Sequence, residues 1–160
     1  MDRPHTGKVV AGAIIEHPVY GFLLQLRDAA APTYPSCWGL FGGHVEPGES
    51  PQYALWRELR EELAFTPAMA QTCRLVQRNA RRDGGTQYIF YIRTQATLDD
   101  LVLGEGEAMR FFAAGTWAGY PLTATLAQIM ADHLAGRRDD EPDSEHDGKH
   151  DGEHDGGQAP

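Results

Sequence analysis

Short runs of β-branched and apolar residues near the start of the chain indicate two strands. Residues 8–16 read KVVAGAIIE, a pattern typical of a buried strand. Residues 20–26 read YGFLLQL and predict a second strand. His17-Pro18 lies between them and favours a turn. The chain therefore opens with a predicted β-hairpin.

The same pattern continues in the middle of the chain. Residues 28–37 contain two prolines and predict a loop, and residues 38–45 predict a short extended segment interrupted at Gly42-Gly43. Strands are expected at 73–81 and 86–97 because Asp83-Gly84-Gly85 between them is a strong hairpin signal. A Gly/Glu-rich loop at 101–107 and a short strand at 108–113 follow.

Helical periodicity marks two segments. Ser50 is a favourable N-cap and Pro51 suits the first helical position, so a helix is expected over 51–63, after a type II turn at 46–49. Its apolar stripe consists of Leu55, Trp56, Leu59 and Leu63. A closing amphipathic helix is predicted over 121–134.

The first helix also carries three carboxylates at spacings that place them on one face. Glu58, Glu61 and Glu62 would repel one another there, which destabilises a helix unless a cation lies among them. Oxygen ligands suit Mg2+ or Mn2+, and Mg2+ commonly binds through a few carboxylates together with substrate phosphates. A solvated, Glu-rich surface helix is the alternative.

Matches over a longer pattern favour the metal site. The spacing is G-x5-E-x7-R-E-U-x-E-E-x-G-U, where U is a bulky apolar residue. The matching residues are Gly43, Glu49, Arg57, Glu58, Leu59, Glu61, Glu62 and Phe65. This pattern resembles the Nudix box of the Nudix hydrolase family, with Ala64 in place of the expected Gly. The resemblance covers residues 7–135 and implies an α/β fold, with a mixed β-sheet inside an α/β/α sandwich.

Length and charge set further limits. A chain of 160 residues suits one domain, which we expect over 1–135. Residues 136–160 are rich in His, Asp and Gly, and carry three basic and nine acidic residues of a chain whose net charge is −9. This tail is predicted to be disordered, and its histidines to bind metal adventitiously or not at all. A metal-buffering protein in which the tail matters most is a further alternative.

Composition also bears on partners and location. The rest of the chain is mildly acidic, so a nucleic-acid polymer is not an expected partner. No apolar run is long enough to span a bilayer, and no signal-peptide pattern starts the sequence, so a cytoplasmic protein is expected. Cys37 and Cys73 are then expected to be reduced thiols, although the sequence leaves a single disulfide between them open. The resemblance adds a homodimer as an expectation.

The resemblance implies roles for residues in and near the box. Glu58, Glu61 and Glu62 correspond to metal ligands, with the carbonyl of Gly42 as a further one. Glu61 or Glu62 would instead hold the attacking water, and the base lies outside the box in many members, which makes Glu105 and Glu107 candidates. Arg57 and Glu49 are expected to pair and steady the metal-binding carboxylates, and so to contribute to catalysis.

The expected activity is hydrolysis. The resemblance implies a Mg2+-dependent enzyme that cleaves a diphosphate linkage in a nucleoside diphosphate derivative, with a nucleoside triphosphate or a nucleotide sugar preferred. A non-catalytic module of the same fold that senses a nucleotide is the alternative. Candidate substrate contacts are Arg27, Tyr34, Trp38, Tyr88 and Phe90, although such residues more often have a core or rim position. Glu107 is a further candidate, with a solvated loop acid as its alternative.

Overall fold

One mixed β-sheet organises the chain. The computed structural model describes residues 7–140, and the side chains of 137–140 are not described. The strands are β1 (Val9–His17), β2 (Gly21–Leu26), β3 (Trp38–Gly39), β4 (Phe41–His44), β5 (Ala70–Ala80), β6 (Thr86–Thr94) and β7 (Ala108–Phe112). The main path runs β3-β2-β1-β6-β5, while β4 pairs with β1 and β7 pairs with β2.

Strand β1 lies at the centre and divides one of its edges between two partners. Its first half pairs antiparallel with β4, from Val10–His44 to Ala13–Phe41, and its last residues pair with the start of β2. The predicted first hairpin is thus confirmed. The other edge of β1 runs parallel to β6 over eight residue pairs, which makes the sheet mixed.

Several strand boundaries differ from those predicted: β5 begins at Ala70, three residues early, and β6 ends at Thr94, three residues early. The segment 38–45 is interrupted at Leu40, and Gly42 and Gly43 lie inside β4. These glycines stay extended because they face Gly12 and Ala11 in the ladder with β1. The later hairpin forms as predicted from β5 and β6, and Asp83 fixes its turn by accepting a hydrogen bond from the Gly85 amide at 2.9 Å.

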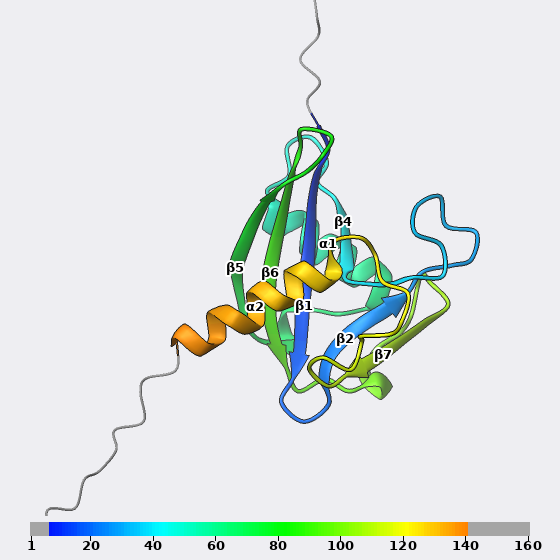
Figure 1. Ribbon diagram of the computed structural model, residues 1–160, viewed down its shortest axis with the longest axis vertical. Coiled ribbons are helices and arrows are strands. Elements are labelled where there is room, and N and C mark those ends of the chain that lie inside the picture. Colours follow the sequence, from blue (N-terminus) through cyan, green and yellow to red (C-terminus); the bar gives the residue numbers. More distant parts are fainter. Residues whose placement is uncertain (1–6, 141–160) are drawn as a thin grey trace, which may run out of the picture.

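The helices α1 (Pro51–Leu63) and α2 (Leu126–Asp140) cover opposite faces of the sheet, α1 behind it and α2 across its front in Figure 1. One core unites Leu55, Leu59 and Leu63 of α1 with the side of β1 that carries Ala13 and Ile15. The other core unites apolar residues of α2 with the opposite side of β1. The α/β/α sandwich is therefore confirmed.

Helix α1 has the predicted bounds. The Ser50 side chain accepts a hydrogen bond from the Tyr53 amide at 3.1 Å, as an N-cap does. At the other end Ala64 adopts the left-handed conformation, with φ 53° and ψ 29°, and its amide donates to the Arg60 carbonyl. The helix therefore ends as it would with Gly at this position, and the chain bears the strain of an alanine there.

Helix α2 begins five residues later than predicted. Residues 121–123 instead extend alongside β3, since Trp38 donates to the Pro121 carbonyl at 2.8 Å and Thr123 donates to the Trp38 carbonyl at 2.9 Å. The helix also continues to Asp140, beyond the predicted domain end at 135. Most of the predicted tail, 141–160, lies outside the described residues. In the described part of the chain no helix is long and apolar enough to cross a membrane.

Candidate functional site

The side chain of Arg57 organises the acids around the start of α1. Its Nε and Nη2 donate to the two carboxylate oxygens of Glu49 at 2.8 and 2.9 Å. Its Nη1 donates to Glu58 at 2.8 Å and lies 3.6 Å from a Glu61 oxygen, and Nη2 also reaches the His44 carbonyl at 3.0 Å. Hydrogen bonding to Arg57 holds the pKa of Glu49 below its usual value.

Glu62 is the buried acid of the group, with only 4% of its surface exposed. The pKa of this carboxyl is raised to about 8, chiefly by burial and also by the neighbouring charges of Glu58 and Glu105. A hydrogen bond from the Gly42 amide at 3.1 Å and the charge of Arg27 act in the opposite direction. Burial and the nearby acids disfavour the ionised form of this carboxyl, and a bound cation would stabilise that form.

The two glycines of β4 have no room for a Cβ, Gly43 because of α1 and Gly42 because of β1. A Cβ on Gly43 would lie 2.5 Å from Cδ and Oε1 of Glu58, and a Cβ on Gly42 would lie 2.1 Å from the Ala11 carbonyl oxygen. Gly42 also has a φ of +144°, which L-residues rarely adopt. The glycines therefore allow the carboxylate of Glu58 to lie directly against the strand backbone.

The loop before β7 is tied to the end of α1. The amides of Val102 and Gly104 donate to the carbonyls of Leu63 and Glu62, at 2.9 and 2.7 Å. These bonds satisfy carbonyls that a helix end leaves without partners. They also bring Glu105 close enough to Glu62 for its negative charge to raise the pKa of Glu62. An acid forty residues beyond the end of the box thus joins the site.

Beside these acids lies a hollow of about 650 Å3, which we call the small hollow. It is lined by Gln25, Arg27, Asp28, Ala29, Ala30, Ala31, Pro32, Glu105, Gly106 and Glu107. Arg27 is held by bonds from Nε and Nη2 to Thr33, at 2.9 and 3.3 Å. Glu107 accepts a hydrogen bond from the Ala29 amide at 3.0 Å. Two of the predicted substrate contacts, Arg27 and Glu107, therefore lie together here.

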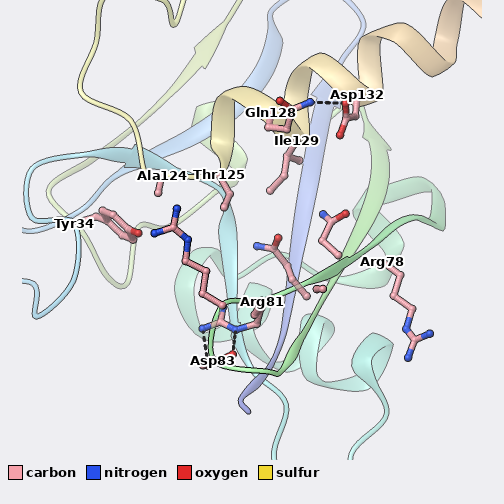
Figure 2. Close-up of a pocket in the computed structure, with 13 residues that line it drawn as sticks. Tyr34, Arg78, Arg81, Asp83, Ala124, Thr125, Gln128, Ile129 and Asp132 are labelled. Atoms are coloured by element: carbon pink, nitrogen blue, oxygen red, sulfur yellow. Dashed lines mark hydrogen bonds and ion pairs between the residues drawn. The ribbon is translucent and has the colours of Figure 1, made fainter.

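A second hollow of about 740 Å3, the large hollow, lies on the face of the sheet covered by α2 (Figure 2). The β5–β6 turn contributes Arg81, Arg82 and Asp83, while Thr125 directly precedes α2 and Gln128 lies in its first turn. Tyr34, in the loop after β2, also lines it. That loop lines the small hollow through its first residues, so it connects the two hollows along the chain.

Comparison with known proteins agrees with this geometry. The family model for the NUDIX domain matches residues 7–129, most of the chain. The chain belongs to the NUDIX family. The match includes the box residues on α1, the turn before it and the strands that carry both hollows.

Relatives of this NUDIX domain include nucleotide-handling proteins. Nucleoside triphosphatase NudI of Salmonella agona (strain SL483) is 39% identical over 56 residues, which are 35% of this chain and 39% of that protein. The aligned part thus spans well under half of that relative's length. The Escherichia coli ORF135 structure has a TM-score of 0.67 at 27% identity, covering 89% of this chain and all of that one. Family and relatives support the prediction of a pyrophosphohydrolase.

A further structural neighbour shows the fold at lower identity. It is the NUDIX domain of Shewanella oneidensis NrtR in a complex with ADP ribose. The TM-score is 0.67 at 15% identity, and the match covers 85% of this chain and 94% of that one.

The acids of the NUDIX box offer carboxylate oxygens, which are the ligands that a hard divalent cation prefers. Within residues 7–140, no three His, Cys, Asp or Glu side chains converge closely enough to form a complete metal-binding group. Mg2+ usually takes only one or two protein carboxylates and fills its remaining positions with waters and phosphates. The buried carboxyl of Glu62, next to Glu58 and the Gly42 backbone, fits such a partial ligand set.

Other predicted contacts lie away from the acids. Trp38 is buried in the core beneath α2, where its ring meets Phe112 edge-on at 5.0 Å. Tyr88 packs on the α1 side beneath the guanidinium of Arg78, and Phe90 is buried in the core there. Neither hollow is lined by these three predicted aromatic residues. Cys37 and Cys73 are free thiols.

Proposed function

We propose that this NUDIX domain hydrolyses a diphosphate linkage in a nucleoside diphosphate derivative, with a nucleoside triphosphate or a nucleotide sugar as the preferred class. Mg2+ or Mn2+ is the proposed cofactor. The observation that carries the proposal is the position of Glu62, a buried carboxyl with a pKa near 8, beside acids that Arg57 orders and close to the small hollow.

Glu58, Glu61 and Glu62 are the candidate ligands, and one or two of these carboxylates would hold the cation together with the carbonyl of Gly42. Such an ion supplies neutralisation of the phosphate charge and a lowered pKa of bound water. Arg57 keeps the Glu58 carboxylate in place, because its Nη1 donates to Oε1 at 2.8 Å. Ordering of this kind is what second-layer residues contribute to metal sites.

The reaction is the addition of water to phosphorus. One P–O bond forms and the bridging P–O bond breaks, the leaving phosphate keeps the bridging oxygen, and the water proton passes to a carboxylate. Arg27 is available to meet phosphate oxygens as charge spreads over them in the transition state. Glu105 is the proposed proton acceptor, because its loop is hydrogen-bonded to the end of α1 beside Glu62.

The large hollow suits the nucleoside part of the substrate. Tyr34 is about half exposed there and offers a ring for stacking, and Gln87 and Gln128 offer amides for the edges of a base. The guanidinium of Arg82 adds positive charge. The loop after β2 lines both hollows, with residues 28–32 in the small hollow and Tyr34 in the large one.

A substrate panel with product identification tests the proposal, comparing nucleoside triphosphates, oxidised analogues, nucleotide sugars and ADP-ribose. The Glu62→Gln variant should lose hydrolysis by orders of magnitude while its circular dichroism and melting curve stay native. Asp99→Asn, an exposed acid of the 3-10 turn Leu98–Asp100, should remain fully active. Unchanged turnover in Glu62→Gln would show that the role given to this carboxyl is wrong.

A non-catalytic nucleotide sensor is the second candidate. The observation in its favour is the NrtR NUDIX domain, which has this fold and binds ADP ribose. The presence of Glu58, Glu61 and Glu62 together favours hydrolysis. Calorimetric binding of a nucleotide without any product, in the presence of Mg2+ or Mn2+, would identify the sensor.

A further inference from the structure

A buried amide in the small hollow is not explained by the box. Gln25 lies near the end of β2, with 6% of its surface exposed, and its carboxamide oxygen has no hydrogen-bond partner within the described protein. Buried polar atoms are nearly always paired, because an unpaired one loses its bonds to water without replacement. An apolar residue would fill this position at lower cost to folding.

Gln25 shares the lining of the small hollow with several charged side chains. Gly106, with φ +88°, passes so close that a Cβ on it would lie 3.5 Å from this oxygen, and both residues line the small hollow. Carboxylates of Asp28, Glu105 and Glu107 line the same space. The charged side chains of this lining are these three carboxylates and Arg27. Because the Gln25 oxygen is itself an acceptor, the occupant that satisfies it must donate a hydrogen bond.

A water molecule fits these requirements. A buried water needs two to four polar partners, and the hollow offers the Gln25 oxygen and nearby carboxylates as acceptors of its two protons. A phosphate oxygen cannot serve, since it accepts and does not donate. Arg27 is the cationic side chain in the lining and remains the group suited to phosphate.

We propose that Gln25 is a positioning residue for the attacking water, an inference that rests on the proposed hydrolysis. Its oxygen accepts one water proton in a hydrogen bond while the carboxylate of Glu105 accepts the other. The lone pair of the water is thereby directed away from the acceptors and toward phosphorus. As the P–O bond forms and the bridging P–O bond breaks, the second proton moves to the carboxylate and the leaving phosphate carries away the bridging oxygen.

The test is the Gln25→Met variant, which keeps a similar volume and removes the acceptor. The wild type and the variant are compared for kcat, KM and metal-free melting temperature on the best substrate of the panel. We expect kcat to fall about 10- to 100-fold with KM within about twofold, because positioning is lost and substrate binding is not. The melting temperature should stay equal or rise, since an unpaired buried acceptor has been removed.

Two further variants separate positioning from packing. Gln25→Glu keeps an acceptor oxygen and should recover part of the lost kcat, with a pH profile shifted from that of the wild type. Gln77→Met is the matched control on the other face of the sheet. There the Gln77 amide donates to the Ile129 carbonyl at 2.9 Å, so this variant should melt lower and keep its kcat.

The outcomes distinguish the two levels of the argument. Absence of any wild-type hydrolysis overturns the proposed function and the role of Gln25 with it. Wild-type hydrolysis together with an unchanged kcat in Gln25→Met overturns the role alone. A raised KM at constant kcat also overturns it, because the amide would then contact the substrate, and so does a lowered melting temperature with a matching loss of active protein.

Discussion

Arg57 donates two parallel hydrogen bonds, of 2.8 and 2.9 Å, to the two carboxylate oxygens of Glu49. This bidentate pair joins the second turn of α1 to the turn that precedes the helix. A third nitrogen of the same guanidinium, Nη1, holds Glu58. The planar guanidinium of arginine suits this arrangement, because its donors can reach both oxygens of Glu49 and one oxygen of Glu58.

Arg57→Lys should therefore disable the site without unfolding the protein. A lysine ammonium keeps the charge but cannot make the two parallel bonds and the bond to Glu58 together. We expect metal affinity or kcat to fall about 10- to 100-fold, as for other residues that orient metal ligands. Titration of activity with Mg2+ measures the change. Arg60→Lys, one turn on and exposed, is the control and should behave as wild type.

Gly43→Ala should impair activity by displacing Glu58. The new Cβ would meet the carboxyl of Glu58 at 2.5 Å, and the end of this flexible side chain can move away. Stability should change little, while kcat falls. Gly12→Ala is the matched control in the neighbouring strand, because its Cβ meets no atom closer than 3.5 Å. Equal activity in the two variants would contradict the expectation.

Ala64→Gly should stabilise the protein. Ala64 sits at φ 53°, where alanine is strained and glycine is not, so we expect a gain of about 1 kcal/mol. For a domain of this size the melting temperature would rise by about 2–4 °C, measured by calorimetry. Ala131→Gly, at an exposed position inside α2, should shift it downward by a similar amount. Activity should be unaffected in both variants.

The metal-free protein should lose stability as the pH rises from about 5 to about 8. The pKa of Glu62 is about 8 in the fold and near 4.5 otherwise, so within this window the folded state binds the extra proton. Its contribution to the unfolding free energy then falls with pH, by up to about 1.4 kcal/mol per pH unit. Urea unfolding in chelator should show this slope in the wild type and not in Glu62→Gln. Parallel slopes would show that Glu62 titrates normally.

Local signals predicted the elements that depend on neighbouring residues. Ser50 and Pro51 set the start of α1, and Asp83-Gly84-Gly85 set the β5–β6 hairpin, because caps and tight turns are decided within a few residues. The family resemblance implies the pairing of Arg57 with Glu49, and the structure contains this ion pair.

Contacts between residues far apart in the sequence account for the features that the sequence did not predict. The start of α2 shifted because residues 121–123 bond to Trp38, more than eighty positions away. The same contacts place Trp38 in the core, although the sequence alone makes its ring a candidate substrate contact. Gln25 gave no sequence signal at all, since its strand reads as uniformly apolar around it. Its position in the small hollow depends on the loop that carries Gly106.

The bonds from Val102 and Gly104 to the end of α1 have a consequence for how the chain can vary in length. A Cβ on Gly104 would lie 2.4 Å from the Glu61 carbonyl oxygen, so this loop packs directly against the helix backbone. Residues inserted here would displace the backbone of two box acids. The loop after β2 has exposed residues at its tip, as sites that accept insertions usually do. New substrate preferences are therefore more readily acquired through that loop than through the one beside the acids.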